Sequence, residues 1–230
     1  MNRTFAGITF ALVFGFAPPV GAQAIDDEFQ SWGAYIFTGQ LEREAPSLRA
    51  WTDLHVRRGS GGSVLIARPG LGYTFAPWIT LWAGYAWVPT FDDAAGSQVD
   101  EHRIWQQLTL QHAAAGWLVQ SRTRLEQRFS ELADDVGLRV REFVRVNYRP
   151  WPDLPFGVAV WDELFVGLND PGWAVQGFDQ NRLFVGPALY VMKSLRIEVG
   201  YAFVYLGREP ADRIQHVWGV NFFTAIAPSR

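Results

Sequence analysis

The stretch VGLRVREFVRVNYR, residues 136–149, decides the fold of this chain. Its charged residues Arg139, Arg141 and Arg145 share one parity, and Val140 and Val144 share the other. Successive side chains of a β-strand point to opposite faces of the sheet. The stretch therefore predicts a strand with one charged face and one apolar face.

The same alternation recurs along the chain, in residues 48–57, 101–111, 118–130 and 195–205. Charges spaced by two, as in 118–130, would be scattered around a helix, so a strand is favoured there as well. Direct counting gives about eleven strands, but single-chain bacterial barrels have an even number, so we expect ten or twelve. The sequence predicts an all-β fold, an antiparallel up-and-down transmembrane β-barrel of about 10–12 strands.

Residues 1–24 have the pattern of a secretory signal peptide. Arg3 supplies the positive charge, residues 6–16 form a short apolar core, and Ala22-Gln23-Ala24 fits the cleavage site. The alternative is a membrane anchor, but the apolar core is too short for one. We therefore expect export through a cleaved signal peptide, with residues 25–230 forming one outer-membrane β-barrel domain of a Gram-negative bacterium.

The composition favours a membrane barrel over a soluble domain. The chain has 11 Trp and 17 Phe but only 19% charged residues, and beyond the signal peptide no apolar run is long enough for a spanning helix. It has no Cys, which excludes disulfides and thiolate metal sites. The net charge of -3 argues against nucleic acid as a partner.

Large aromatic residues favour lipid rather than water outside the barrel. Many stand beside expected turns, where the aromatic girdles of a membrane barrel lie. We place these residues on the apolar face: Trp78, Trp87, Trp105, Trp117, Tyr148, Trp151, Trp161, Trp173, Tyr201, Tyr205 and Trp218. Short and long connections also alternate along the chain, as tight periplasmic turns and longer outer loops do.

The charged parity then faces the interior of the barrel. We expect the following residues to form a polar ladder in the lumen: Glu101, Arg103, Arg122, Arg124, Glu126, Arg128, Arg139, Arg141, Arg145, Glu163, Arg182, Arg196 and Glu198. Such a ladder is either a plug of paired charges that stabilises the barrel or an anion-favouring lining of a channel.

Several short motifs occur in an order that resembles a known family. They include Trp32, Gly84-Tyr85, EHRIWQQL at 101–108, RxRLExR at 122–128, DELF at 162–165, QNRL at 180–183, Gly200-Tyr201 and His216-Val217. This succession resembles the family catalogued as domain of unknown function 2490. The resemblance implies an outer-membrane barrel with a signal peptide, and it brings no catalytic residues with it.

No set of residues in the sequence predicts catalysis, metal binding or a cofactor. Among the histidines, His102 stands beside Glu101, but neighbouring strand residues face opposite sides and cannot share a site. No HxH or HExxH pattern occurs. We therefore predict that the chain is not an enzyme and has no cofactor.

Three functions remain open from the sequence. The first is transport, through a narrow solute channel with an Arg/Glu-lined lumen. The second is a closed structural or binding barrel that uses its outer loops, such as residues 169–179. The third, which we disfavour, is a membrane-embedded enzyme that modifies lipid or peptide. The expected partners are outer-membrane lipid, lipopolysaccharide and the outer-membrane assembly machinery, and the oligomeric state is left open.

Overall fold

The computed structural model describes residues 25–41, 47–151 and 153–226. The predicted signal peptide, residues 1–24, lies outside the described residues. No helix long and apolar enough to cross a membrane occurs in these three segments. They form the strands β1 (Ile25–Gln40), β2 (Leu48–Arg58), β3 (Gly62–Ala76), β4 (Ile79–Asp92), β5 (Ser97–Ala114), β6 (Trp117–Ser130), β7 (Gly137–Tyr148), β8 (Phe156–Gly167), β9 (Gly177–Met192), β10 (Leu195–Leu206) and β11 (Asp212–Ile226).

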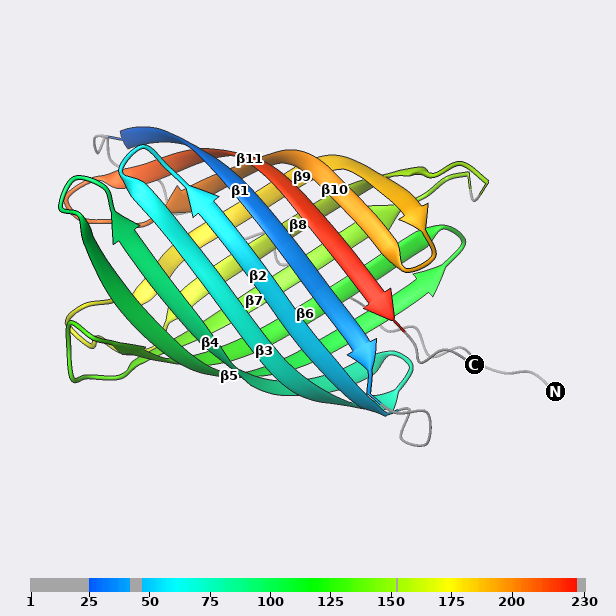
Figure 1. Ribbon diagram of the computed structural model, residues 1–230, viewed down its shortest axis with the longest axis horizontal. Helices are drawn as coiled ribbons and strands as arrows, with labels where there is room; N and C mark the ends of the chain where they lie inside the picture. The colour runs from blue at the N-terminus through cyan, green and yellow to red at the C-terminus, as the bar shows by residue number, and fades with distance from the viewer. Residues whose placement is uncertain (1–24, 42–46, 152, 227–230) are drawn as a thin grey trace.

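The eleven strands close into one barrel, in which each strand pairs with its neighbours in sequence. All of these pairings are antiparallel except the one that closes the barrel, where β1 and β11 run side by side in the same direction (Figure 1). This seam extends from Ile25↔Asp212 to Gly39↔Ile226. The expectation of an even number of strands is wrong, because an odd number of alternating strands also closes when its first and last members pair in parallel.

The connections fall at two ends of the barrel. The loop end carries residues 59–61, 93–96, 131–136, 168–176 and 207–211. The turn end carries residues 41–47, 77–78, 115–116, 149–155 and 193–194. Three of the turn-end connections have two residues each, but 41–47 and 149–155 are longer. The predicted contrast between short turns and long loops is therefore only partial.

The barrel has an apolar outer face and a polar inner face, as the alternation requires. On the outside, Leu71 is 64% exposed and Val56 is 53% exposed. On the inside, Arg124 and Glu126 are completely buried. The polar parity of the strands therefore points into the barrel.

Polar side chains on the outer face are paired across neighbouring strands. Gln106 and Gln127 exchange two hydrogen bonds, of 3.1 and 3.0 Å between amide nitrogen and oxygen. Asn181 Nδ2 donates to both carboxylate oxygens of Asp162 at 3.1 Å. Ser121 Oγ donates to Glu142 Oε1 at 3.3 Å. A polar group in an apolar environment costs free energy when it has no hydrogen-bond partner, and these pairs reduce that cost.

The aromatic residues do not all lie on the outer face, so part of the girdle prediction is wrong. Trp105 is completely buried inside, and Trp161 lines an interior cavity. Both share the parity of polar interior residues, Arg103 and Glu163 respectively, and that parity decides the face. Trp173 belongs to the connection between β8 and β9.

Glycines in β3 and β4 make room for the interior Trp105. A Cβ atom at Gly70 would lie 2.5 Å from the Trp105 ring, and one at Gly84 would lie 2.4 Å from it. The indole is also fixed in orientation, since Trp105 Nε1 donates to the carbonyl oxygen of Tyr85 at 3.1 Å. An apolar cluster around Trp105 thus lies on the inner face of β2 to β5, and the guanidinium carbon of Arg124 lies 4.6 Å from the Trp105 ring centroid.

Candidate functional site in the barrel lumen

The described residues enclose several cavities inside the barrel, of which three lie along the charged face. The loop-end cavity, of about 530 Å³, is lined by Trp173 and Arg208 among others. The side cavity, of about 370 Å³, reaches the β2–β3 turn at Gly61. The turn-end cavity, of about 250 Å³, reaches Thr224 near the end of β11. These cavities therefore extend toward both ends of the barrel.

Four arginines lie where the cavities approach one another. Arg57 from β2 and Arg182 from β9 line all three cavities. Arg68 from β3 and Arg141 from β7 line both the loop-end and the turn-end cavity. We call these four residues the waist of the lumen.

Glu126 is the centre of an ion-pair network beside the waist. It accepts hydrogen bonds from Arg139 Nε and Nη2, at 3.1 and 2.7 Å, and from Arg141 Nη1 at 2.7 Å. Two further guanidinium nitrogens, of Arg103 and Arg124, lie 3.9 and 3.8 Å from its oxygens. Strands β5, β6 and β7 supply these groups, so the network ties neighbouring strands together inside the barrel.

Glu163 extends the network to β8 and β9. Its Oε1 accepts hydrogen bonds from Arg122 Nη2 at 2.5 Å and from Arg141 Nη2 at 2.7 Å. Arg182 Nη1 lies 3.8 Å from Glu163 Oε2, beyond hydrogen-bond distance. Arg141 thus bridges Glu126 and Glu163, and its side chain is fixed on both sides.

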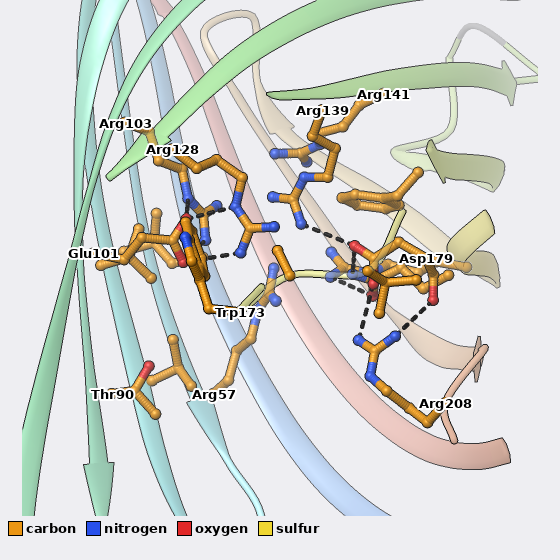
Figure 2. Close-up of a pocket in the computed structure, with 18 of the residues that line it drawn as sticks. Arg57, Thr90, Glu101, Arg103, Arg128, Arg139, Arg141, Trp173, Asp179 and Arg208 are labelled. Carbon is orange, nitrogen blue, oxygen red and sulfur yellow. Dashed lines mark hydrogen bonds and ion pairs between the residues drawn. The ribbon is translucent and has the colours of Figure 1, made fainter. Parts of the chain in front are cut away.

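At the loop end, two carboxylates each hold a pair of arginines. Glu101 accepts from Arg103 and Arg128, with shortest distances of 2.8 and 2.6 Å. Asp179 lies 3.0 Å from Arg139 Nη1 and 2.9 Å from Arg208 Nη2. Figure 2 shows these two groups on opposite sides of the loop-end cavity.

The β8–β9 connection packs against the first of these groups. The Trp173 ring lies 4.9 Å from the guanidinium carbon of Arg128, within cation–π range. Its Nε1 donates to the carbonyl oxygen of Asp135 at 2.8 Å. The connection is thereby held against the loop-end cavity.

At the turn end, Glu198 of β10 is completely buried. It accepts a hydrogen bond from Asn147 Nδ2 at 2.8 Å. Arg196 Nε and Arg145 Nη2 lie 3.0 and 3.4 Å from its oxygens. All thirteen residues of the predicted ladder therefore project into the interior, and each has an oppositely charged or amide partner there.

Sequence reasoning left several interior residues out of the ladder. Asp53 and Arg68 form a buried pair, with 2.7 Å between Asp53 Oδ2 and Arg68 Nη1. Arg57 and Asp179 also face the cavities, and Trp32 lies beside Arg57. Arg57 and Asp53 share a parity in β2 that already read as polar, so their strand pattern could have added them.

Arginine outnumbers carboxylate around the cavities. Twelve arginines line the three cavities, against seven aspartates and glutamates. A guanidinium stays charged and presents a planar fork of donors that fits carboxylates and phosphates. The lining of these cavities therefore carries more cationic than anionic side chains.

The histidines lie on both faces of the barrel: His55 lines the turn-end cavity, while His102 and His216 face outward. Among the described residues, no three His, Asp or Glu side chains lie close enough together to hold a metal ion. His102 faces outward and is hydrogen-bonded to Tyr85, while Glu101 faces inward. His216 is likewise paired on the outer face, with Tyr201, at 2.5 Å between Nδ1 and the phenol oxygen.

The sequence profile of a family described as protein of unknown function (DUF2490) matches residues 29–215. This chain belongs to the DUF2490 family. The resemblance predicted from its short motifs is thereby confirmed. An uncharacterized protein of Methylorubrum extorquens is 32% identical to the chain over 212 residues, which are 88% of this chain and 91% of that protein.

Among solved structures, LpxR from Salmonella typhimurium is similar with a TM-score of 0.40 and 9% identity, over 72% of this chain and 80% of that chain. LpxR is an enzyme in a barrel fold. The prediction that this chain is not an enzyme is therefore wrong as an exclusion, because a barrel of this kind does not rule out catalysis. The likeness at this level assigns no activity or substrate to the DUF2490 chain.

Proposed function

We propose that this protein is an outer-membrane β-barrel whose arginine-rich lumen gives small anions a narrow path across the membrane. The outer face supports the membrane location, since exposed apolar side chains such as Leu71, Val56 and Val185 cover it. Soluble proteins rarely expose apolar surface this continuously. On this proposal, the outer face contacts outer-membrane lipid and lipopolysaccharide, and the assembly machinery of that membrane inserts the barrel.

The observation that carries the proposal is the waist. Cavities from the loop end and the turn end share Arg57, Arg68, Arg141 and Arg182 as lining residues. A ring of fixed positive charge at a constriction attracts anions and repels cations. Because Arg141 is held by two carboxylates, its guanidinium would stay in place as an ion passes.

A closed binding barrel is the second candidate function. It is favoured by the completely buried Arg124, Glu126 and Glu198, which occupy interior volume that a wide pore would leave to water. In that case the loop-end cavity, about 530 Å³ in volume, would bind a ligand without passing it on.

Single-channel recording separates the two candidates. The refolded protein is inserted into a planar bilayer under a salt gradient, after a heat-modifiability gel has shown that the barrel is folded. We expect a steady current whose reversal potential reports anion preference. Arg182→Gln should reduce that preference, whereas Arg58→Gln, at an exposed pair with Asp93, should leave it unchanged.

Two results would count against an anion path. A folded barrel without conductance would refute the anion path and favour the closed binding barrel. A current with cation preference, or one that Arg182→Gln does not alter, would mean that ions do not pass the waist.

A further inference from the structure

We infer that the centre of the lumen contains a specific site for a small oxyanion, a phosphate or a carboxylate, held by Arg57 and Arg182 beside Trp32. The inference deepens the proposed function, because it names the class of anion and the residues that would bind it. It does not require that ions cross the membrane, and its test measures binding rather than current.

Among the residues that the structure describes, Arg57 has no carboxylate partner, unlike the other arginines of the waist. Arg68 is paired with Asp53, and Arg141 is paired with both Glu126 and Glu163. For Arg57, the described residues offer no hydrogen bond or ion pair, and its buried Nε has no partner. In Figure 2 its side chain extends into the cavity between the two ion-pair groups. A charge withdrawn from bulk water without a partner favours binding of a counter-ion.

Arg182 provides a second guanidinium with unused donor capacity. Its Nε and Nη2 both donate to Gln180 Oε1, at 3.0 and 2.8 Å. Its Nη1 is 3.8 Å from the nearest oxygen of Glu163, too far for a hydrogen bond. The group is thus oriented by Gln180, and one of its nitrogens remains available to an anion.

Both guanidinium groups lie against the ring of Trp32. The guanidinium carbon of Arg57 lies 4.2 Å from the ring centroid, and that of Arg182 lies 5.0 Å from it. Two cations beside one aromatic ring repel each other, and an anion bound to both would offset that repulsion. Since both residues line all three cavities, an anion could reach them from either end.

The Trp32 ring is itself held in position by a chain of hydrogen bonds across the parallel seam. Trp32 Nε1 donates to Gln30 Oε1 at 2.7 Å, and Gln30 Nε2 donates to Glu28 Oε2 at 2.9 Å. Gln215 of β11 donates to the same Glu28 oxygen at 3.1 Å. Trp32 is therefore a positioning residue, and the site is formed before an anion arrives.

The chemistry of the two arginines favours an oxyanion over a halide. A guanidinium presents parallel N–H groups that match two oxygens of one carboxylate or phosphate. Chloride has a single acceptor centre and gains less from that fork. We therefore expect phosphate or acetate to bind in preference to chloride.

The test is isothermal titration calorimetry on the refolded protein in detergent, with inorganic phosphate, acetate and chloride as separate ligands at constant ionic strength. The matched variants are Arg57→Met, which removes the charge inside the lumen, and Arg58→Met, which removes the charge of the next residue on the outside. We expect saturable oxyanion binding, weakened at least about tenfold by Arg57→Met and unchanged by Arg58→Met.

The ligand panel identifies the source of the anion. Phosphate alone indicates a phosphate ligand, and acetate alone indicates a carboxylate ligand. Absence of saturable oxyanion binding, equal binding of chloride, or full binding by Arg57→Met would overturn the inference. Should Arg57→Met fail to refold, Arg57→Lys keeps the charge without the fork, and undiminished phosphate and acetate binding by that variant would also overturn it. Binding that depends on Arg57 in a barrel without conductance would support this site while refuting the anion path.

Discussion

Replacing Glu126 by Gln tests whether the interior network stabilises the barrel. The change keeps the size of the side chain and one carbonyl oxygen but removes a negative charge that is completely buried. Glu126 accepts three hydrogen bonds, from Arg139 and Arg141, and has two more guanidinium groups within 3.9 Å. Breaking a buried ion pair by removing one partner costs about 3–5 kcal/mol.

The structure points to the lower end of that range. Arg139 keeps Asp179 and Arg141 keeps Glu163 after the substitution, so neither guanidinium is left without a carboxylate. We therefore expect Glu126→Gln to lower the free energy of unfolding by about 3 kcal/mol. The measurement is equilibrium urea unfolding of the refolded barrel in detergent, followed by tryptophan fluorescence.

The exposed pair between Arg58 and Asp93 is the matched control. Their side chains are 56% and 44% exposed, so Asp93→Asn should change the free energy of unfolding by less than about 1 kcal/mol. If Glu126→Gln also stayed within about 1 kcal/mol of the unsubstituted protein, the interior ion pairs would contribute no more than surface pairs do. The reasoning from buried charge would then be refuted.

Two further substitutions test packing. Gly70→Ala should destabilise the barrel by about 1–3 kcal/mol in the same urea titration, because its Cβ would lie 2.5 Å from the buried Trp105 ring. Gly33→Ala should be close to neutral, since nothing lies within 4 Å of its Cβ. Equal effects of the two substitutions would show that Gly70 is not needed to make room for Trp105. Trp173→Ala removes the contact with Arg128, so residues 168–176 should be cleaved faster in limited proteolysis by a non-specific protease. An unchanged cleavage rate would show that other contacts hold this connection.

The alternation in the sequence was enough to predict the barrel and the inward direction of most charged side chains. In β7, Arg139, Arg141 and Arg145 are buried while Leu138 is exposed, as parity requires. Parity also assigns Trp105 to the interior, but the usual preference of aromatic residues for a membrane interface suggested the opposite. The local pattern was the better guide at that position, because backbone geometry fixes the face before side-chain preference acts.

Other features of the site depend on contacts between residues far apart in the chain. Within the described part of the chain, Arg57 lacks a carboxylate partner because of where the acids of other strands lie. The strand register that sets those positions cannot be read from β2 alone. The parallel pairing of β1 with β11 also joins opposite ends of the sequence. Parity gives the direction of a side chain but not its partner.

The parallel seam determines where the two ends of the barrel chain emerge. Ile25 pairs beside Asp212 at the loop end, while Ile226 pairs beside Gly39 at the turn end. Joining them by circular permutation would need a linker that runs the full length of the seam, roughly 50 Å for fifteen residue pairs. In a barrel that spans a membrane, epitopes fused next to β1 and after β11 would face different compartments, so labelling each from one side would establish the orientation of the whole molecule.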